Sequence, residues 1–217
     1  MLTDNLKKSV RDLRFLLNKG YPKDSAVEFV SDHYLLDSEK RHFLIRSVYP
    51  KEKISTHESK LIDISEIRDR KVKIDGYNVL ITTESILRGD LTIRCDDGAL
   101  RDLQANFGSY QIDDYTEESV KTVLNILEGF CPQKITFCFD KQVSKSGELA
   151  GFVREELSKR GILGDAEAIG GVDKEVWNSE VAASSDSLII EKAERVIDIP
   201  KEFLKTDNTE FVDLKEI

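Results

Sequence analysis

The sequence predicts an α/β protein with a parallel sheet that carries helices on both faces, preceded by a small all-helical domain. Apolar residues recur at helical spacing through the first 50 residues. From residue 71 onward, short apolar strands alternate with amphipathic helices, which is the pattern of a parallel sheet. A polar stretch of mixed charge separates the two regions. We therefore expect a helical domain at 1–50, a linker at 51–70 and a three-layer α/β domain at 71–217.

The composition predicts a cytoplasmic globular protein. The 217 residues include 32 Lys and Arg and 41 Asp and Glu, for a formal net charge of −9, and 40% are hydrophobic. No apolar run approaches the roughly 20 residues of a membrane span, and no signal peptide opens the chain. Three cysteines, an odd number, argue against a fully paired disulfide framework. We expect no membrane contact and, in the absence of a Gly-rich phosphate loop, no organic cofactor.

The acidity is confined to one part of the chain. Residues 1–72 hold 15 basic and 12 acidic side chains, a net of +3, whereas residues 73–217 hold 17 and 29, a net of −12. A basic and an acidic region predict two domains with different tasks. Any surface that attracts phosphate is therefore expected on the N-terminal domain or on an arginine-bearing hairpin, rather than on the α/β body.

Three helices are expected in the first 50 residues, over 3–18, 24–33 and 38–48. Gly20 and Pro22 end the first of them. The spacing of the second and third resembles a helix-turn-helix, in which the third would be a basic recognition helix. An ordinary solvated helix face explains the same pattern, and we favour it. The basic residues concerned are Lys40, Arg41, His42 and Arg46.

The α/β region is expected to alternate regularly after a long link. The stretch 82–115 holds a predicted hairpin, with a strand at 91–95 and a turn at 96–98. The remaining expected strands are 71–74, 134–139, 166–169, 180–183 and 195–199, and the expected helices are 116–129, 146–160, 173–178 and 187–193.

Three of these strands end in an aspartate, at Asp75, Asp140 and Asp186, and Asp173 opens a predicted helix. The carboxyl ends of parallel strands share one edge of the sheet, so these side chains are expected to converge. Clustered carboxylates repel one another unless a cation lies between them. Mg²⁺ and Mn²⁺ prefer such oxygen ligands and can promote hydrolysis of a phosphoester.

A second interpretation of these acids stays open. Aspartate is common after strands as a turn former or helix cap, and any single one of the four is more simply explained in that way. Three in register on successive parallel strands are harder to explain so, and the sequence pattern leaves metal binding and capping about equally supported.

Four segments resemble the NYN branch of the PIN-like nucleases. They are KIDGYNVL, ITFCFDK, GGVDKEVWNSEVAASSDSLII and VIDIPKEFL, and their order and spacing fit over residues 71–205. The resemblance implies a Mg²⁺ or Mn²⁺ site made by Asp75, Asp140, Asp173 and Asp186. It places Asn78 near the ion, gives Ser185 a hydrogen bond within the site, and implies RNA as the substrate of phosphodiester hydrolysis. Because many PIN-like domains pair, it also allows a homodimer.

The whole chain also resembles an uncharacterised archaeal family in which a small helical domain precedes such a domain. The segment that carries this likeness is Leu16-Leu17-Asn18-Lys19-Gly20-Tyr21-Pro22. No activity follows from this likeness.

Two features depart from the nuclease pattern. Where related sequences have two adjacent acids, this chain has Asp173-Lys174-Glu175, so Lys174 could pair with a phosphate or weaken metal binding. The hairpin could act as a lid whose Arg101 meets phosphate. One of its acids, Asp96, Asp97 or Asp102, could then join the site. We favour a surface hairpin with charged turns instead.

The sequence thus predicts a divalent-metal-dependent ribonuclease, with the helical domain contacting nucleic acid or a protein. One alternative is a module without catalysis that binds RNA or protein on the same scaffold. Another is a phosphatase acting on a small phosphoester.

Overall fold

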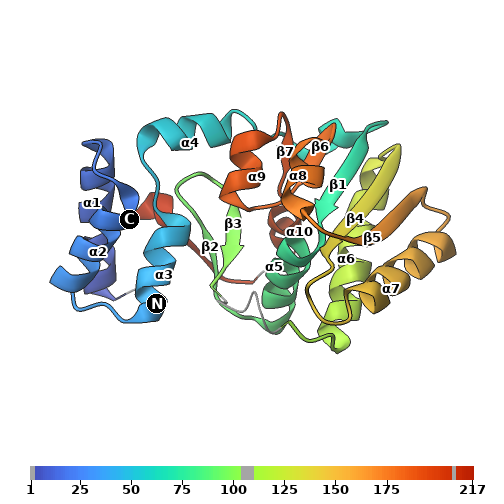
Figure 1. Ribbon diagram of the computed structural model, residues 1–217, viewed down its shortest axis with the longest axis horizontal. Helices are drawn as coiled ribbons and strands as arrows, with labels where there is room; N and C mark the ends of the chain where they lie inside the picture. Colours follow the sequence, from blue (N-terminus) through green and yellow to red (C-terminus); the bar gives the residue numbers. More distant parts are fainter. Residues whose placement is uncertain (1–2, 104–109, 207–208) are drawn as a thin grey trace. The chain divides into compact units, whose positions relative to one another are not determined.

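The computed structural model describes residues 3–103, 110–206 and 209–217 (Figure 1). The chain divides into two compact units. The N-terminal unit comprises Met1–Glu58, Leu91–Ala105 and Glu210–Ile217, and the α/β unit comprises Ser59–Asp90 and Asn106–Thr209.

Helices make up most of the N-terminal unit. They are α1 (Asp4–Asn18), α2 (Lys23–His33), α3 (Ser38–Ser47) and α4 (Lys51–Glu58). The side chain of Thr3 accepts the N–H of Leu6 and that of Asp37 accepts the N–H of Lys40, so α1 and α3 begin at capped residues. The first three helices match the sequence prediction, and α4 lies in the stretch expected to be a linker.

The rest of the N-terminal unit is a small sheet. Strand β2 (Thr92–Arg94) pairs antiparallel with β3 (Leu100–Asp102) and parallel with β8 (Phe211–Asp213), which leads into the short helix η2 (Leu214–Glu216). Ile93 and Leu214 join the buried core formed by α1, α2 and α3. The sequence placed all of 71–217 in one domain, whereas the structure assigns 91–105 and 210–217 to the unit of the N-terminal helices.

The prediction that the hairpin is a surface loop with exposed charged turns is wrong, because four of its charged side chains are buried. Asp96, Asp97, Arg101 and Asp102 are each at most 4% exposed. The guanidinium of Arg101 donates to both carboxylate oxygens of Asp97, at 2.8 and 2.7 Å. His57 is another partner of Asp97, since its Nδ1 lies 2.9 Å from Oδ2. Although burial opposes it, Arg101 and His57 hold the pKa of Asp97 well below its usual range.

A five-stranded parallel sheet forms the centre of the α/β unit. Its order is β5-β4-β1-β6-β7. The strands are β1 (Lys71–Asp75), β4 (Lys134–Asp140), β5 (Gly164–Ile169), β6 (Val181–Ala183) and β7 (Val196–Ile197). The α/β class and the parallel sheet predicted from the sequence are confirmed.

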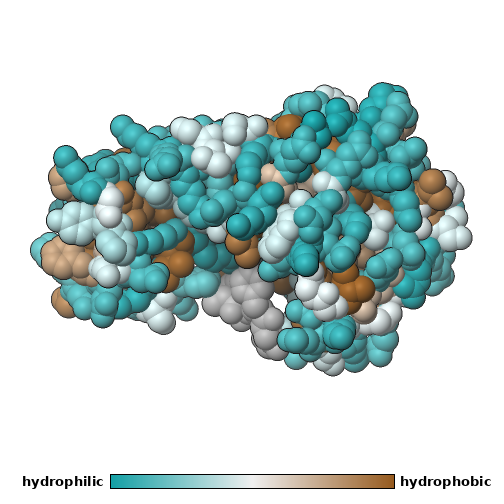
Figure 2. Space-filling model, turned by 45° about the horizontal axis from the view of Figure 1, so that its top comes forward, coloured by the Kyte–Doolittle hydropathy of each residue, from teal (hydrophilic) through white to brown (hydrophobic). Residues whose placement is uncertain are grey.

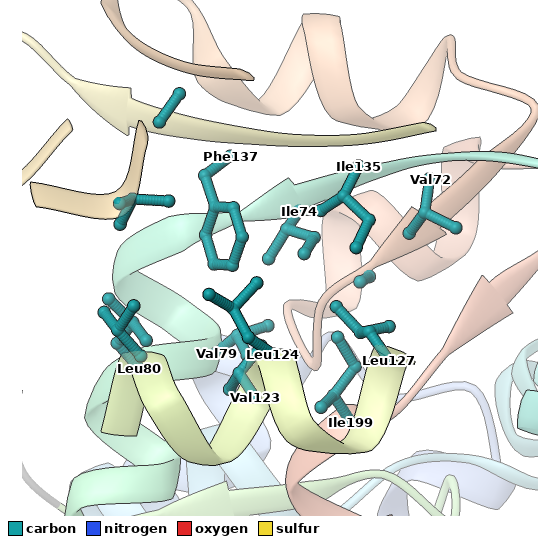
Figure 3. Close-up of a cluster of buried hydrophobic side chains, with 14 of the residues drawn as sticks. Val72, Ile74, Val79, Leu80, Val123, Leu124, Leu127, Ile135, Phe137 and Ile199 are labelled. Atoms are coloured by element: carbon teal, nitrogen blue, oxygen red, sulfur yellow. The ribbon is translucent and has the colours of Figure 1, made fainter. Parts of the chain in front are cut away.

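Helices cover both faces of this sheet. Helix α6 packs on α5, α7 and α10, whereas α8 packs on α9 and on the central strands. The helices are α5 (Gly76–Arg88), α6 (Asp114–Phe130), α7 (Ser146–Lys159), α8 (Val172–Trp177), α9 (Ser187–Lys192) and α10 (Ile199–Thr206), with a short helix η1 (Ile64–Ile67) before β1. Figure 3 shows side chains of β1 and β4, among them Ile74 and Phe137, packed against α5 and α6.

The last expected strand is shorter than predicted. Strand β7 ends at Ile197, and α10 begins at Ile199. The side chain of Asp198 accepts the N–H of Lys201 at 3.1 Å, so this aspartate caps a helix that the strand prediction over 195–199 did not include.

Candidate functional site

The strand order of the α/β unit reverses between β1 and β6. Counted along the chain, the five strands lie in the order 3-2-1-4-5, so connections leave β1 and β6 in opposite directions. In parallel sheets such a reversal leaves a crevice at the carboxyl ends of the two strands, where ligands bind. A pocket of about 310 Å³ is lined by Asp75, Tyr77, Asn78, Ile81, Tyr110, Asp140, Val143, Val172, Asp173 and Asp186. All four predicted acids and Asn78 therefore line one pocket.

The backbone of the sheet explains why these acids meet. Asp75 is the last residue of β1 and Asp140 the last of β4, and the two strands are parallel neighbours. Asp186 follows β6 on the other side of β1 and caps α9. Asp173 lies in the first turn of α8. Parallel strands and short strand-to-helix turns thus bring acids from four separate segments to one edge.

Two of the acids also have a local structural role. Oδ1 of Asp186 accepts the N–H groups of Leu188 and Ile189, and Oδ1 of Asp140 accepts the N–H of Gln142 at 2.8 Å. The capping interpretation of the sequence therefore applies to both. Each uses one carboxylate oxygen in this way, and within the described chain the other oxygen makes no hydrogen bond, so capping and ligand binding are compatible.

Asn78 connects the two central strands. Its Oδ1 accepts the backbone N–H of Ser185 at 2.7 Å and the Ser185 hydroxyl at 3.1 Å. The Ser184 hydroxyl lies 3.0 Å from Oδ2 of Asp75 and 3.2 Å from Oδ1 of Asn78, and it accepts the N–H of Asp186. Ser184 was not predicted, although it stands in the Ser-Ser-Asp run that drew attention to its neighbours.

Asp75 is the most perturbed carboxyl of the site. Burial, helped by the nearby charges of Asp186 and Asp173, raises its pKa to about 7, although the hydrogen bond from Ser184 acts in the opposite direction. Burial and the charges of Asp186 and Asp140 also raise the pKa of Asp173. The four carboxylates are therefore close enough for their negative charges to repel one another.

Basic side chains do not neutralise this pocket. None of the four acids forms an ion pair with a residue that the structure describes. An excess of hard oxygen donors without a cationic partner suits a divalent cation such as Mg²⁺ or Mn²⁺. No three His, Cys, Asp or Glu side chains among the described residues are arranged to hold an ion as they stand. Mg²⁺ commonly keeps several waters and takes only one or two carboxylates, so the donor set fits without a closed cage.

Aromatic rings form another wall of the pocket. Tyr77 contacts Tyr110 edge-on at 5.0 Å between ring centroids, and Phe139 at 5.2 Å. The Tyr110 hydroxyl donates to the buried carboxylate of Glu84 and lies 3.0 Å from the Thr116 hydroxyl. Burial raises the pKa of Glu84. The role of Tyr110 and Glu84 was not predicted, because no spacing rule links a loop tyrosine to a carboxylate inside a helix.

The other predicted site residues lie elsewhere. Lys174 is exposed in α8 and does not line the pocket. Arg101 is buried within the N-terminal unit on Asp97, which does not fit the role of an arginine that meets phosphate. The three hairpin acids also have partners within that unit: Asp96 pairs with Arg14, Asp97 with Arg101 and Asp102 with Arg46.

Comparison with known proteins places the chain in a family. Residues 64–202 match the model of a domain of unknown function, DUF5616. The chain belongs to this family. Residues 5–60 match a second model, described as a protein of unknown function, DUF434. The chain is 34% identical over 203 residues to an uncharacterised protein of Methanocaldococcus jannaschii, MJ0935, covering 93% of this chain and 97% of that protein.

The first matched range of this DUF5616 member spans α1 to α4, and the second spans η1 to most of α10. Strands β2 and β3 of the N-terminal unit therefore fall within the second range. No solved structure matches the chain. In the part of the chain that the structure describes, every helix is too short or too polar to span a bilayer. Neither family has a known function and the relative is uncharacterised, so the nuclease prediction stays a prediction.

Proposed function

We propose that the α/β unit is a PIN-like domain that hydrolyses RNA phosphodiester bonds with the help of Mg²⁺ or Mn²⁺. The observation that carries this proposal is that Asp75, Asp140, Asp173 and Asp186 line the same pocket. Among the described residues, no Lys, Arg or His forms an ion pair with any of these four acids. The strand order, with its reversal beside Asp75, supports the fold assignment.

The four aspartates would hold the ion. When bound, such an ion supplies Lewis-acid stabilisation of phosphate charge and lowers the pKa of a water molecule. Asn78 and Ser184 hold the acids in place, since Asn78 fixes the segment after β6 and the Ser184 hydroxyl contacts Asp75. Tyr77 and Tyr110 line the pocket beside these acids, where they exclude water and offer ring surface to a substrate.

The first test is metal binding by the full chain. We expect Mn²⁺ to raise the melting temperature of the wild type but not that of Asp75→Asn. Asp69→Asn is the matched control, because Asp69 is exposed, lies before the amino end of the same strand and has a φ of 59° that asparagine tolerates. A wild-type protein that shows no shift would support the module without catalysis.

The second test is cleavage. Incubated with a pool of structured RNAs and Mn²⁺, the wild type should cut, and Asp186→Asn should cut at a small fraction of that rate. Equal cleavage by the two proteins would point to a contaminating nuclease and contradict the proposal. A wild type that spares RNA but releases phosphate from small phosphoesters would favour a phosphatase.

A further inference from the structure

Four lysines gather where three helices of the N-terminal unit begin or end. Lys19 follows the last residue of α1, Lys23 is the first residue of α2, Lys51 is the first of α4, and Lys53 lies in the first turn of α4. The side chain of Asn18 accepts the backbone N–H of Lys51 at 2.9 Å, which joins the end of α1 to the start of α4. We call these lysines, together with Phe15 and Tyr21, the basic corner.

Tyr49 joins α2 and α4 within the basic corner. The amino groups of Lys23 and Lys53 lie 4.0 and 5.7 Å from the centroid of the Tyr49 ring, and the guanidinium of Arg101 lies 5.4 Å from it. Three cations thus approach one aromatic ring. Burial, and then the charges of Lys53 and Arg101, lower the pKa of Lys23 to about 8. Burial is the larger cause of this shift, and the two neighbouring cations add to it.

Three of the four lysines of the basic corner lack an acidic partner among the described residues. Among the described residues, Lys19, Lys23 and Lys51 form no ion pair, although Asp24 and Glu52 are their neighbours in sequence. Helix α3, for which the sequence left a recognition helix open as the less favoured interpretation, differs, because each of its long cations is paired. Lys40 pairs with Asp37, Arg41 with Asp32 and Arg46 with Asp102. Among these cations, the unpaired ones therefore lie at the basic corner and not on α3.

Two aromatic rings of the basic corner face solvent. Phe15 is 62% exposed and Tyr21 is 57% exposed. The amino group of Lys19 lies 5.7 Å from the centroid of the Phe15 ring, so an exposed ring and an unpaired cation are neighbours. Figure 2 shows apolar surface between polar side chains on the N-terminal unit. Exposed rings beside cations are what single-stranded nucleic acid uses, with bases stacked on rings and phosphates on lysines.

We propose that the basic corner binds a single strand of nucleic acid, with phosphates at Lys19, Lys23 and Lys51 and bases stacked on Phe15 and Tyr21. An acidic peptide would match the lysines but leave both rings exposed. A regular duplex would also leave them exposed, because its bases are already stacked. The binding does not depend on the proposed hydrolysis, since the basic corner and the acidic pocket belong to different units.

The test is the fluorescence anisotropy of a labelled single-stranded RNA of 12 mixed nucleotides, measured with the full chain in EDTA so that metal-dependent cleavage does not contribute. The triple variant Lys19→Gln, Lys23→Gln, Lys51→Gln should bind more weakly. The slope of log K against log salt should fall in magnitude by about 2, since each phosphate contact on a single strand contributes about 0.7. The aromatic variants Phe15→Ala and Tyr21→Ala should each weaken binding on the order of 5- to 150-fold and leave this slope unchanged.

Matched controls test the location and the chemistry. Lys40→Gln removes a paired cation from α3, and Phe29→Ala removes a 67% exposed ring from α2, and both should bind like the wild type. Melting temperatures check that every variant folds. Three results would overturn the proposal: aromatic variants that bind normally, a polyglutamate peptide of equal charge that binds as tightly as RNA, or equal binding of a duplex of the same sequence. Loss of RNA cleavage in the acidic-pocket variants would leave it intact.

Discussion

The amide oxygen of Asn78 lies 2.7 Å from the backbone nitrogen of Ser185 and accepts its N–H. Asn78 stands in the first turn of α5, and Ser185 follows β6, so this bond crosses the point where the strand order reverses. Both residues are buried. The contact fixes the segment that carries Asp186 relative to the helix that follows Asp75, and the position of two of the four acids depends on it.

Replacing Asn78 by alanine should therefore lower stability. The variant leaves the buried N–H of Ser185 without its acceptor, and an unsatisfied buried donor costs about 1–3 kcal/mol. Urea unfolding measures this change. Asn178→Ala is the control, because the Asn178 amide donates to the Lys174 carbonyl at an exposed site, and we expect a loss within about 0.5 kcal/mol. Similar losses in the two variants would contradict the role given to Asn78.

The raised pKa of Asp75 makes stability depend on pH in the metal-free protein. Burial raises the pKa to about 7, above the unfolded value of 3.8, so the folded state favours the protonated carboxyl. Its contribution is fully present below pH 3.8 and is lost as the pH rises through 7. Asp75→Asn cannot ionise, and we expect it to melt at a higher temperature than the wild type at pH 8 in EDTA.

The same substitution should also remove the stabilisation by Mn²⁺. At pH 8 the difference in melting temperature between Asp75→Asn and the wild type should therefore be positive in EDTA and negative in Mn²⁺. Melting curves at pH 5 and pH 8, with and without Mn²⁺, measure both effects. Asp69→Asn should follow the wild type throughout. If Asp75→Asn were less stable than the wild type at pH 8 without metal, the carboxylate would have a stabilising partner that the structure does not show.

The predictable part of the site follows from backbone periodicity. Asp75, Asp140 and Asp186 follow strands whose direction the strand–helix alternation predicts, so the meeting of these acids in one pocket could be expected before the structure. The part of Ser184 in the site could not be predicted, because its contact with Asp75 depends on the register of β6 beside β1. Tyr110 lies before α6, and no local pattern predicts that its hydroxyl reaches Glu84.

The division of the chain was harder to predict for a related reason. Strand β8 pairs with β2 across 119 residues, as in Thr92 with Phe211, and the hairpin of β2 and β3 closes on the N-terminal helices. The charges in its turn indicated a surface loop. They are buried because each has an oppositely charged partner, and sequence patterns do not predict such partners across long separations.

Gly76 is a position where a single methyl group should be destabilising. A Cβ there would lie 2.3 Å from Cε1 of Phe139, well inside the contact distance of two carbon atoms. Gly76→Ala should cost about 1–3 kcal/mol through overpacking between α5 and β4. Gly151→Ala is the control, since the nearest atom there is the end of the flexible Arg154 side chain at 3.9 Å. Alanine inside a helix should then stabilise by about 0.5–1 kcal/mol. Opposite signs of the two changes in urea unfolding are the expected result.

Breaking the ion pair of Asp97 and Arg101 should strongly destabilise the N-terminal unit. Both side chains are buried, and Asp97→Asn would leave the guanidinium without its counter-charge, which costs about 3–5 kcal/mol. The pKa of Asp97 is well below its usual range, so its contribution is present above the unfolded pKa and is lost only as the pH falls toward the folded value. The variant should therefore be less stable at pH 7, and its disadvantage should shrink in strong acid.

Hydrogen exchange followed by mass spectrometry places this loss in the chain. We expect faster exchange in α4 and in β2 and β3 and little change in β1 and β4, because the pair lies within the N-terminal unit. Glu117→Gln is the control, since its pair with Lys121 is exposed on α6 and should contribute less than about 1 kcal/mol. If Asp97→Asn were as harmless as this control, Arg101 would have enough other contacts to stay buried, and the ion pair would not be what holds the hairpin in the N-terminal unit.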